Sequence, residues 1–175
     1  MITRTLRGSA TDRTAIDPRV IDHFHASAAL YKIWSMDGHL HFGYWRWPMN
    51  IAHRKGMLEA MVHRVVRELR PRVGQRLAGL GCGYGASARL VASTYDCAVD
   101  AFTVVPEQVK EGCMRAAADH IDVTMHLRDF RHTDLPTASM DGVYALESLC
   151  YGSGHGKADV LMEAALGSVG LLKAL

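Results

Sequence analysis

The stretch Leu-Ala-Gly-Leu-Gly-Cys-Gly-Tyr-Gly-Ala at residues 77–86 decides the fold of this 175-residue chain. A short apolar run breaks there into glycines at alternate positions, Gly81, Gly83 and Gly85. Glycines at this spacing let the backbone turn sharply and let a ligand approach it without side chains in the way. A helix that follows such a turn directs its free N–H groups toward a polar or anionic ligand. The stretch therefore predicts a strand–turn–helix unit that binds a nucleotide-like cofactor.

The segments around this stretch alternate between strand and helix patterns. The strands are expected over residues 76–80, 97–104, 123–127 and 142–146, and the helices over residues 85–94, 106–119 and 157–166. Alternating β and α units are typical of a parallel sheet with helices on both faces, so the fold class is α/β.

Two further helices are expected before this core. One spans residues 18–34, and the other begins after Asn50 as its N-cap and ends near Pro71. An aromatic, glycine-punctuated loop lies between them. We therefore expect three regions, a flexible polar N-terminus at residues 1–17, helices with an aromatic lid at residues 18–70, and a cofactor-binding core at residues 71–175.

The composition restricts the function classes. A formal charge of +2 without a basic run argues against a nucleic-acid partner. No apolar run is long enough to span a bilayer, and residues 1–17 lack the apolar core of a secretory signal. The four cysteines are widely separated and the ten histidines dispersed, which predicts neither a metal site nor a disulfide framework. A reduced, cytoplasmic setting follows.

Taken alone, the glycine loop leaves alternatives open. The pattern Gly81-x-Gly83-x-x-Ala86 also fits a dinucleotide-binding fingerprint, and Asp100 lies at about the ~20-residue offset of a ribose-binding acid. An NAD-dependent oxidoreductase and a ligand-free strand–helix turn both remain compatible with the isolated motif.

The wider sequence resembles a known family. The segments that carry the likeness are Leu-His-Phe-Gly-Tyr-Trp at 40–45, the glycine loop at 77–85, residues 99–109, Asp-Phe at 129–130 with Leu-Pro at 135–136, and Asp-Gly-Val-Tyr-Ala-Leu-Glu-Ser at 141–148. In this order they resemble the motifs of class I S-adenosylmethionine-dependent methyltransferases, in the branch with sterol, tocopherol, sugar-O, geranyl-diphosphate and cyclopropane-type enzymes. The resemblance implies a Rossmann-like core, S-adenosyl-L-methionine as cofactor, and a small-molecule acceptor such as an isoprenoid, a quinol or a sugar.

The resemblance also implies roles for particular residues. The residues that would bind the cofactor are Gly81, Cys82, Gly83, Gly85, Thr103, Gln108, Asp129 and Phe130. The glycine loop would run under the amino-acid tail and ribose, with Cys82 packing rather than acting as a nucleophile. Thr103 and Gln108 would hydrogen-bond a hydroxyl or carboxylate, unless they are an ordinary strand-end threonine and a solvated glutamine. Asp129 would accept from the adenine amino group, with Phe130 N–H facing a ring nitrogen, or else Asp129 only caps a turn.

The candidate catalytic residues are Glu147 and Tyr151, which follow the fourth expected strand. In the family branch the corresponding glutamate faces the reacting centre. Glu147 would stabilise a carbocation if the acceptor is an alkene, or it or a nearby histidine would take a proton if the acceptor is a hydroxyl. A salt-bridged or helix-capping Glu147 is the structural alternative. The aromatic loop would act as a lid over the cofactor, or as simple core filler.

The chain departs from the family pattern in three places. Gly79 replaces the usual Asp of the first motif, and Phe24 stands where related sequences often have Tyr. After Ala165 the expected Pro-Gly-Gly turn and the last strands of a seven-stranded fold are absent. We therefore expect an incomplete sheet of four strands whose exposed edge favours homo-oligomers. An inactive cofactor-binding or interaction fragment is the corresponding alternative function.

Overall fold

The computed structural model describes residues 18–35, 37–49, 52–151 and 172–174. Its elements are α1 (Pro18–Trp34), α2 (Arg54–Val66), η1 (Arg67–Leu69), β1 (Arg76–Leu80), α3 (Ala86–Tyr95), β2 (Ala98–Thr103), α4 (Pro106–Ala118), β3 (Val123–Leu127), β4 (Gly142–Ala145), η2 (Leu149–Tyr151) and β5 (Leu172–Ala174). The predicted alternation of strand and helix is confirmed. The predicted polar N-terminus and the helix over residues 157–166 lie outside the described residues.

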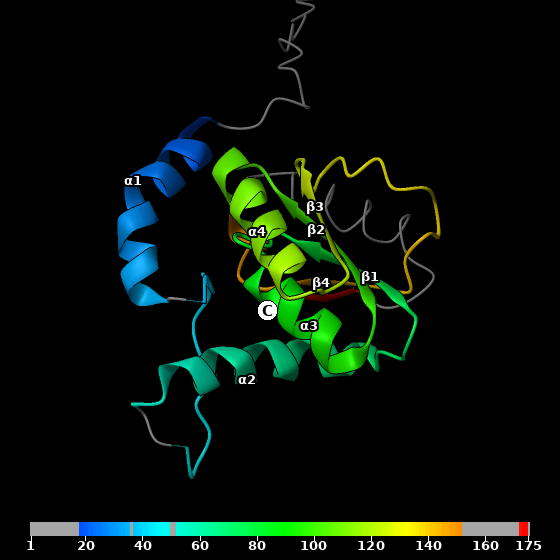
Figure 1. Cartoon of the computed structure of the whole chain (residues 1–175), viewed down its shortest axis with the longest axis horizontal. Coiled ribbons are helices and arrows are strands. Elements are labelled where there is room, and N and C mark those ends of the chain that lie inside the picture. The colour runs from blue at the N-terminus through cyan, green and yellow to red at the C-terminus, as the bar shows by residue number, and fades with distance from the viewer. Residues whose placement is uncertain (1–17, 36, 50–51, 152–171, 175) are drawn as a thin grey trace, which may run out of the picture.

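The strands form one parallel sheet in the order β3-β2-β1-β4-β5 (Figure 1). β1 lies at its centre, where every residue except Arg76 is buried, which explains its nearly continuous apolar and small composition. The structure adds a fifth strand to the four that the sequence predicts. β5 pairs with β4 from Val143 opposite Leu172 to Ala145 opposite Ala174, so its backbone groups satisfy the edge of β4.

The described helices α2, α3 and α4 lie together on one face of the sheet (Figure 1). Buried side chains of α2 and α3 form the larger core with Cys97 and the strands, and Val109 of α4 packs against it: Val62, Val65, Val66, Leu77, Ala88, Val91, Ala92, Cys97, Val99, Ala101, Met125 and Tyr144. The opposite face carries a smaller core against which Phe130, Leu135 and Leu149 pack from the loops after β3 and β4. No helix within the described ranges is long and apolar enough to traverse a bilayer.

The helix boundaries follow local sequence signals in two of three cases. α3 begins directly after Gly85, whose φ of +73° lies in the left-handed region that favours glycine. α4 begins at Pro106, and proline suits the first helical position. The start of α2 is predicted wrongly. α2 begins at Arg54, after His53, and no side chain caps it. Asn50, the expected cap, lies outside the described residues.

Candidate cofactor and acceptor site

A cavity of about 1090 Å³ opens at the carboxyl ends of the strands. Its walls come from the glycine loop after β1, the end of β2, the loop after β3, the residues after β4, the aromatic loop and α1. Ligands of open parallel sheets bind in this position, beyond the carboxyl ends of the strands. The volume lies at the upper end of the usual range for ligand pockets, so the cavity has room for a cofactor and part of an acceptor.

The glycine loop leaves no room for side chains at its turn. Gly81 has a φ of +71°, and a Cβ there would lie 2.3 Å from Ser148 Cβ. At Gly83, with a φ of +55°, a Cβ would lie 2.7 Å from Leu40 Cδ1. Gly81 lines the cavity, whereas Gly83 and Gly85 lie behind it and pack the loop against its neighbours. The glycines therefore serve packing as well as ligand approach.

Cys82 lines the cavity but carries an unreactive thiol. Burial raises the pKa of Cys82 to about 12, and its Sγ donates to Gly83 O at 3.6 Å. A thiolate nucleophile would need a lowered pKa. The geometry supports the predicted packing role for this residue.

Thr103 and Gln108 meet at the end of β2 and line the cavity. The Thr103 hydroxyl donates to Gln108 Oε1 at 2.5 Å and accepts from the Val105 N–H at 3.3 Å. Both side chains are buried, so the alternative of a solvated glutamine is wrong. The pair presents an amide and a hydroxyl to the cavity in a fixed geometry.

Phe130 and Asp129 are adjacent in sequence but have different surroundings in the structure. Phe130 lines the cavity, but Asp129 is not among the lining residues. Asp129 Oδ1 accepts from the Arg131 backbone N–H at 2.9 Å, and both carboxylate oxygens accept from the Arg131 guanidinium. Burial alone would raise the pKa of Asp129, but these Arg131 hydrogen bonds lower it. In this geometry Asp129 caps its turn, the alternative recognised from the sequence.

Glu147 lies in the cavity wall just after β4, with its backbone in the left-handed region at a φ of +54°. Residues other than glycine adopt this conformation at an energetic cost, which tertiary contacts must support. One such contact comes from the aromatic loop, because the Phe42 N–H donates to Glu147 Oε1 at 3.1 Å. The carboxylate is therefore held at the junction of β4 and the aromatic loop.

Tyr151 also lines the cavity, where it meets α1. Its ring centroid lies 5.5 Å from that of Phe24, and Phe24 in turn contacts Tyr31 at 6.1 Å. At the other side of α1, His25 Nε2 pairs with Glu107 of α4 at 3.0 Å. Figure 1 shows α1 as the outermost element beside α4. Phe24, Tyr31 and Tyr151 thus form a continuous aromatic part of the cavity wall.

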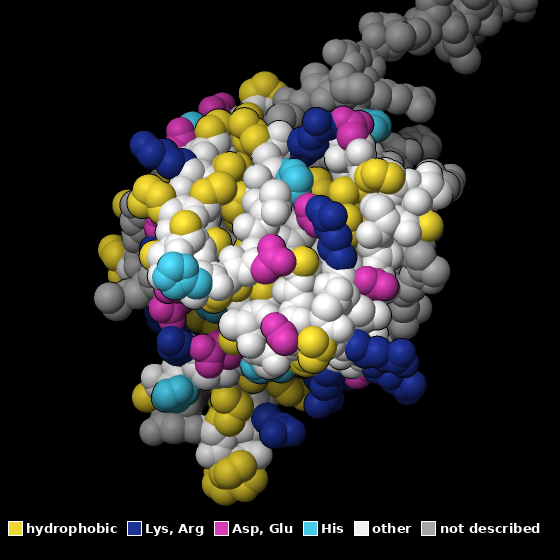
Figure 2. Space-filling view, turned by 45° about the vertical axis from the view of Figure 1, so that its right-hand side comes forward, with side chains coloured by type: hydrophobic (Ala, Val, Ile, Leu, Met, Phe, Trp, Pro, Cys, Tyr) yellow, Lys and Arg dark blue, Asp and Glu magenta, His cyan; other side chains and the backbone are white. Residues whose placement is uncertain are grey.

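The aromatic loop, the predicted lid, is not core filler, and its action as a lid stays a prediction. Phe42 lines the cavity with 68% of its surface exposed, and Trp45 is 50% exposed. Trp47 of the same loop is 80% exposed, and Figure 2 shows hydrophobic side chains on the segment that protrudes below the molecule. Residues of a packed core would be buried, so the core-filler interpretation is wrong.

A buried polar cluster that sequence reasoning missed docks this loop on α3. His41 Nδ1 donates to the Phe42 carbonyl at 2.8 Å, since a carbonyl can only accept. His41 Nε2 is then an acceptor with a single lone pair, which His39 Nδ1 at 3.1 Å and the Ser87 hydroxyl at 3.2 Å can each reach. Burial, and next the neighbouring His41, lower the pKa of His39 to about 4. Both imidazoles are thus neutral at neutral pH, and both take part in hydrogen bonds.

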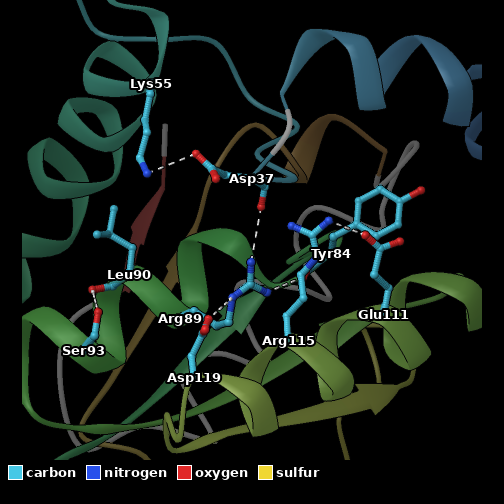
Figure 3. Close-up of polar contacts among 9 residues, drawn as sticks. All are labelled: Asp37, Lys55, Tyr84, Arg89, Leu90, Ser93, Glu111, Arg115 and Asp119. Carbon is cyan, nitrogen blue, oxygen red and sulfur yellow. Dashed lines mark hydrogen bonds and ion pairs between the residues drawn. The ribbon is translucent and has the colours of Figure 1, made fainter.

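Arg89 is a second missed residue, and it joins the lid to the glycine loop (Figure 3). Its side chain is 10% exposed. It donates to the Tyr84 carbonyl at 2.9 Å and to the Asp37 carbonyl at 3.3 Å, and its Nε lies 3.8 Å from Asp119 at the end of α4. An arginine among the small residues of α3 was the available signal, because a buried guanidinium requires several acceptors.

The structure disfavours the dinucleotide-binding alternative. Asp100 lies inside β2 with 1% of its surface exposed. Its carboxylate accepts from Arg76 Nε at 2.6 Å and from His126 Nε2 at 2.7 Å. Burial by itself raises the pKa of Asp100, but the hydrogen bonds from Arg76 and then His126 lower it. Both oxygens are used within the sheet, so Asp100 is not the strand-end acid that grips a ribose.

Comparisons with known proteins agree with this geometry. The methyltransferase domain family matches residues 78–166. A curated O-methyltransferase from Pyrenophora dematioidea is 32% identical over 119 residues, which cover 66% of this chain and 45% of that protein. Another, from Penicillium expansum, is 27% identical over 151 residues, which cover 85% of this chain and 55% of that protein. The chain thus spans about half the length of these curated relatives.

A solved structure extends the likeness to the fold. The crystal structure of the [4+2]-cyclase SpnF superposes with a TM-score of 0.80 at 20% identity, covering 92% of this chain and 60% of that one. At this identity the likeness concerns the fold alone. Because the family match covers half of the sequence and includes the glycine loop, the chain belongs to the methyltransferase domain family, the S-adenosylmethionine-dependent enzymes with a Rossmann-like fold.

Proposed function

We propose that this protein transfers a methyl group from S-adenosylmethionine to a small, largely apolar acceptor that carries a hydroxyl. The observation that carries the proposal is the division of the cavity. Backbone and polar groups line it at β1 and β2, whereas aromatic side chains of α1 and η2, together with Glu147, line it elsewhere.

The residues over β1 and β2 fit the cofactor. The turn at Gly81 brings backbone to the cavity without a side chain, and the Thr103–Gln108 pair supplies hydrogen-bonding groups for ribose hydroxyls. Phe130 offers an apolar surface for adenine. S-adenosylmethionine, when bound, supplies an electrophilic methyl group on a sulfonium. Methyl transfer then depends mainly on alignment of the acceptor and exclusion of water.

The α1 side of the cavity suits an apolar acceptor. Val20, Phe24 and Tyr31 of α1 and Tyr151 of η2 line it. Aromatic side chains favour flat or isoprenoid skeletons over charged ones, and Phe42 of the lid closes the same side. O-methyltransferases among the relatives support a hydroxyl as the reacting group.

Glu147 is the proposed proton acceptor for that hydroxyl. His41 lines the cavity too, but both of its ring nitrogens take part in the hydrogen bonds that dock the lid. Oε1 of Glu147 accepts a hydrogen bond from the Phe42 N–H, and its other carboxylate oxygen would take the proton of the substrate hydroxyl. Tyr151 orients the acceptor through its ring in this proposal.

The proposal includes a cytoplasmic setting and excludes a nucleic-acid substrate. The net charge of +2 and the free state of Cys82, Cys97, Cys113 and Cys150 support both points. A homo-oligomer formed through a sheet edge stays a prediction, to be tested by light scattering.

Titration calorimetry with S-adenosylmethionine and with S-adenosylhomocysteine tests the cofactor part. Binding of both, unaffected by NAD, is expected. A folded sample that binds neither would refute the proposal. Mass-spectrometric detection of methylation over a panel of apolar phenols and alcohols then tests the acceptor part, and methylation of alkenes alone would contradict it. Cofactor binding without methylation of any acceptor would instead support the alternative of an inactive cofactor-binding fragment.

A further inference from the structure

Tyr144 fills a space that the absence of a side chain at Gly79 leaves open. The two residues lie directly opposite each other in the register of β1 and β4. A Cβ placed on Gly79 would lie 2.8 Å from Tyr144 Oη and 3.0 Å from Cζ. The end of the Tyr144 ring therefore lies over β1, immediately before the turn at Gly81, and not over its own strand.

The Tyr144 hydroxyl is buried without a hydrogen-bond partner among the described residues. Tyr144 as a whole is 2% exposed. A buried hydroxyl that forms no hydrogen bond is destabilising, and a phenylalanine would fill the same space without this cost. Burial also raises the pKa of Tyr144 well above its usual value, so the group stays a neutral hydroxyl that can both donate and accept.

Tyr144 and Gly79 both line the cavity, next to Gly81 and Cys82. The Thr103–Gln108 pair lies at the end of β2, on the other side of β1. In the proposed function, Thr103 and Gln108 would hold the ribose and Phe130 the adenine, so the residues of β1 and β4 would be left for the amino-acid tail. The unpartnered hydroxyl is thus at the end of the site where the ammonium and carboxylate of that tail would lie.

We propose that the Tyr144 hydroxyl is a binding group for the amino-acid tail of the cofactor. The inference rests on the proposed function and assigns to the cofactor a residue that the motif likeness does not. The hydroxyl accepts from the tail ammonium or donates to the tail carboxylate, and Gly79 is the residue that makes room for it. The polar tail then satisfies a group that the free protein leaves without a partner.

The test compares two ligands on one substitution, Tyr144→Phe. S-adenosylhomocysteine carries the tail, whereas 5′-methylthioadenosine keeps the adenosine and lacks the tail. Calorimetry is expected to show about a tenfold or larger loss of affinity for S-adenosylhomocysteine, the effect of a hydrogen bond to a charged group. Affinity for 5′-methylthioadenosine should stay within about twofold, because uncharged apolar contacts are unchanged. The melting temperature of the free variant should equal or exceed that of the wild type.

Tyr95→Phe is the matched control, because Tyr95 lies at the end of α3 and does not line the cavity. It should change neither affinity. Gly79→Ala is a second variant, whose added methyl displaces the hydroxyl and should reproduce the selective loss. Equal affinity of wild type and Tyr144→Phe for S-adenosylhomocysteine, or a parallel loss for both ligands, would overturn the inference. A wild-type protein that binds neither ligand would instead refute the proposed function.

Discussion

The backbone N–H of Phe42 donates a hydrogen bond to Oε1 of Glu147, with 3.1 Å between the two atoms. This contact ties the lid to the residue that carries the proposed proton-accepting carboxylate. It also supports the left-handed backbone of Glu147, whose φ is +54°. The position of the aromatic loop and that of the Glu147 carboxylate therefore depend on each other.

Glu147→Gln separates the two roles of this residue. The amide oxygen still accepts from Phe42 N–H, but the side chain can no longer take a proton. We expect kcat for an O-methylation to fall by about 10²- to 10⁴-fold, the usual contribution of a general base. The affinity for S-adenosylhomocysteine should stay within about twofold. Steady-state kinetics and calorimetry measure the two quantities.

Glu68→Gln is the control for this substitution, since Glu68 is exposed on η1 and pairs with Arg64. Its activity should match that of the wild type. Unchanged kcat in Glu147→Gln with a hydroxyl acceptor would exclude Glu147 as the base.

Arg89→Met tests whether the buried guanidinium joins the lid to the glycine loop. The substitution keeps most of the side-chain volume but leaves the Tyr84 and Asp37 carbonyls without their donor. We expect the free energy of unfolding to fall by about 2–3 kcal/mol, as for hydrogen bonds to a charged group. Cofactor affinity should fall as well, because Arg89 no longer holds Tyr84 of the glycine loop and Asp37 of the aromatic loop together.

Urea denaturation gives the stability, and Arg64→Met serves as the comparison. Arg64 forms an exposed i,i+4 pair with Glu68, so its loss should cost less than about 1 kcal/mol. Equal effects of the two substitutions would argue that Arg89 is an ordinary surface arginine.

The histidine cluster predicts a pH dependence of stability. The pKa of His39 is about 4 in the folded state and 6.5 in the unfolded chain, so below pH 6.5 the unfolded chain binds more protons. The free energy of unfolding should therefore fall as the pH falls from about 6.5 to about 4, by a total on the order of 3 kcal/mol. Denaturation at pH 7.5 and pH 5 measures the part of this loss that falls above pH 5, on the order of 2 kcal/mol.

His39→Gln removes the titrating imidazole and should flatten this part of the pH profile. His23→Gln, on the exposed side of α1, should leave the profile as in the wild type. A wild-type profile that is flat between pH 7.5 and pH 5 would show that His39 is protonated in the folded protein.

Asp100→Asn distinguishes a structural carboxylate from a ribose-binding one. The substitution weakens the hydrogen bonds from Arg76 and His126 in the middle of the sheet. We expect a destabilisation of about 2–4 kcal/mol, since a buried charged network loses one partner. Affinity for S-adenosylhomocysteine, measured on the folded variant, should be unchanged. A selective loss of nucleotide binding would restore the dinucleotide interpretation.

Local sequence patterns predict the elements that local physics controls. The glycines of residues 81–85 demand a turn whatever surrounds them, and Pro106 marks the start of α4. The buried runs of β1 and β2 identify central parallel strands for the same reason. These features need no knowledge of distant residues, so the fold class and the place of the site are readable from the chain.

The site contacts that sequence reasoning missed are contacts between distant segments. His39 and Ser87 lie on different elements, and so do Arg89 and Asp37. No spacing along the chain distinguishes these pairs from surface residues. The orientation of Asp129 toward Arg131 is local, but a turn-capping and a ligand-binding aspartate have the same sequence signature.

The position of α1 has a consequence for how ligands enter and leave. The His25–Glu107 pair and the Phe24–Tyr151 contact fasten this helix beside the cavity, and the first of them is exposed to solvent. Releasing such contacts requires far less free energy than unfolding the sheet. Water competes with an exposed hydrogen bond, so the His25–Glu107 contact adds little to the attachment of α1. Detachment of α1 should therefore open the proposed acceptor side of the cavity, while the buried Thr103–Gln108 side stays in place.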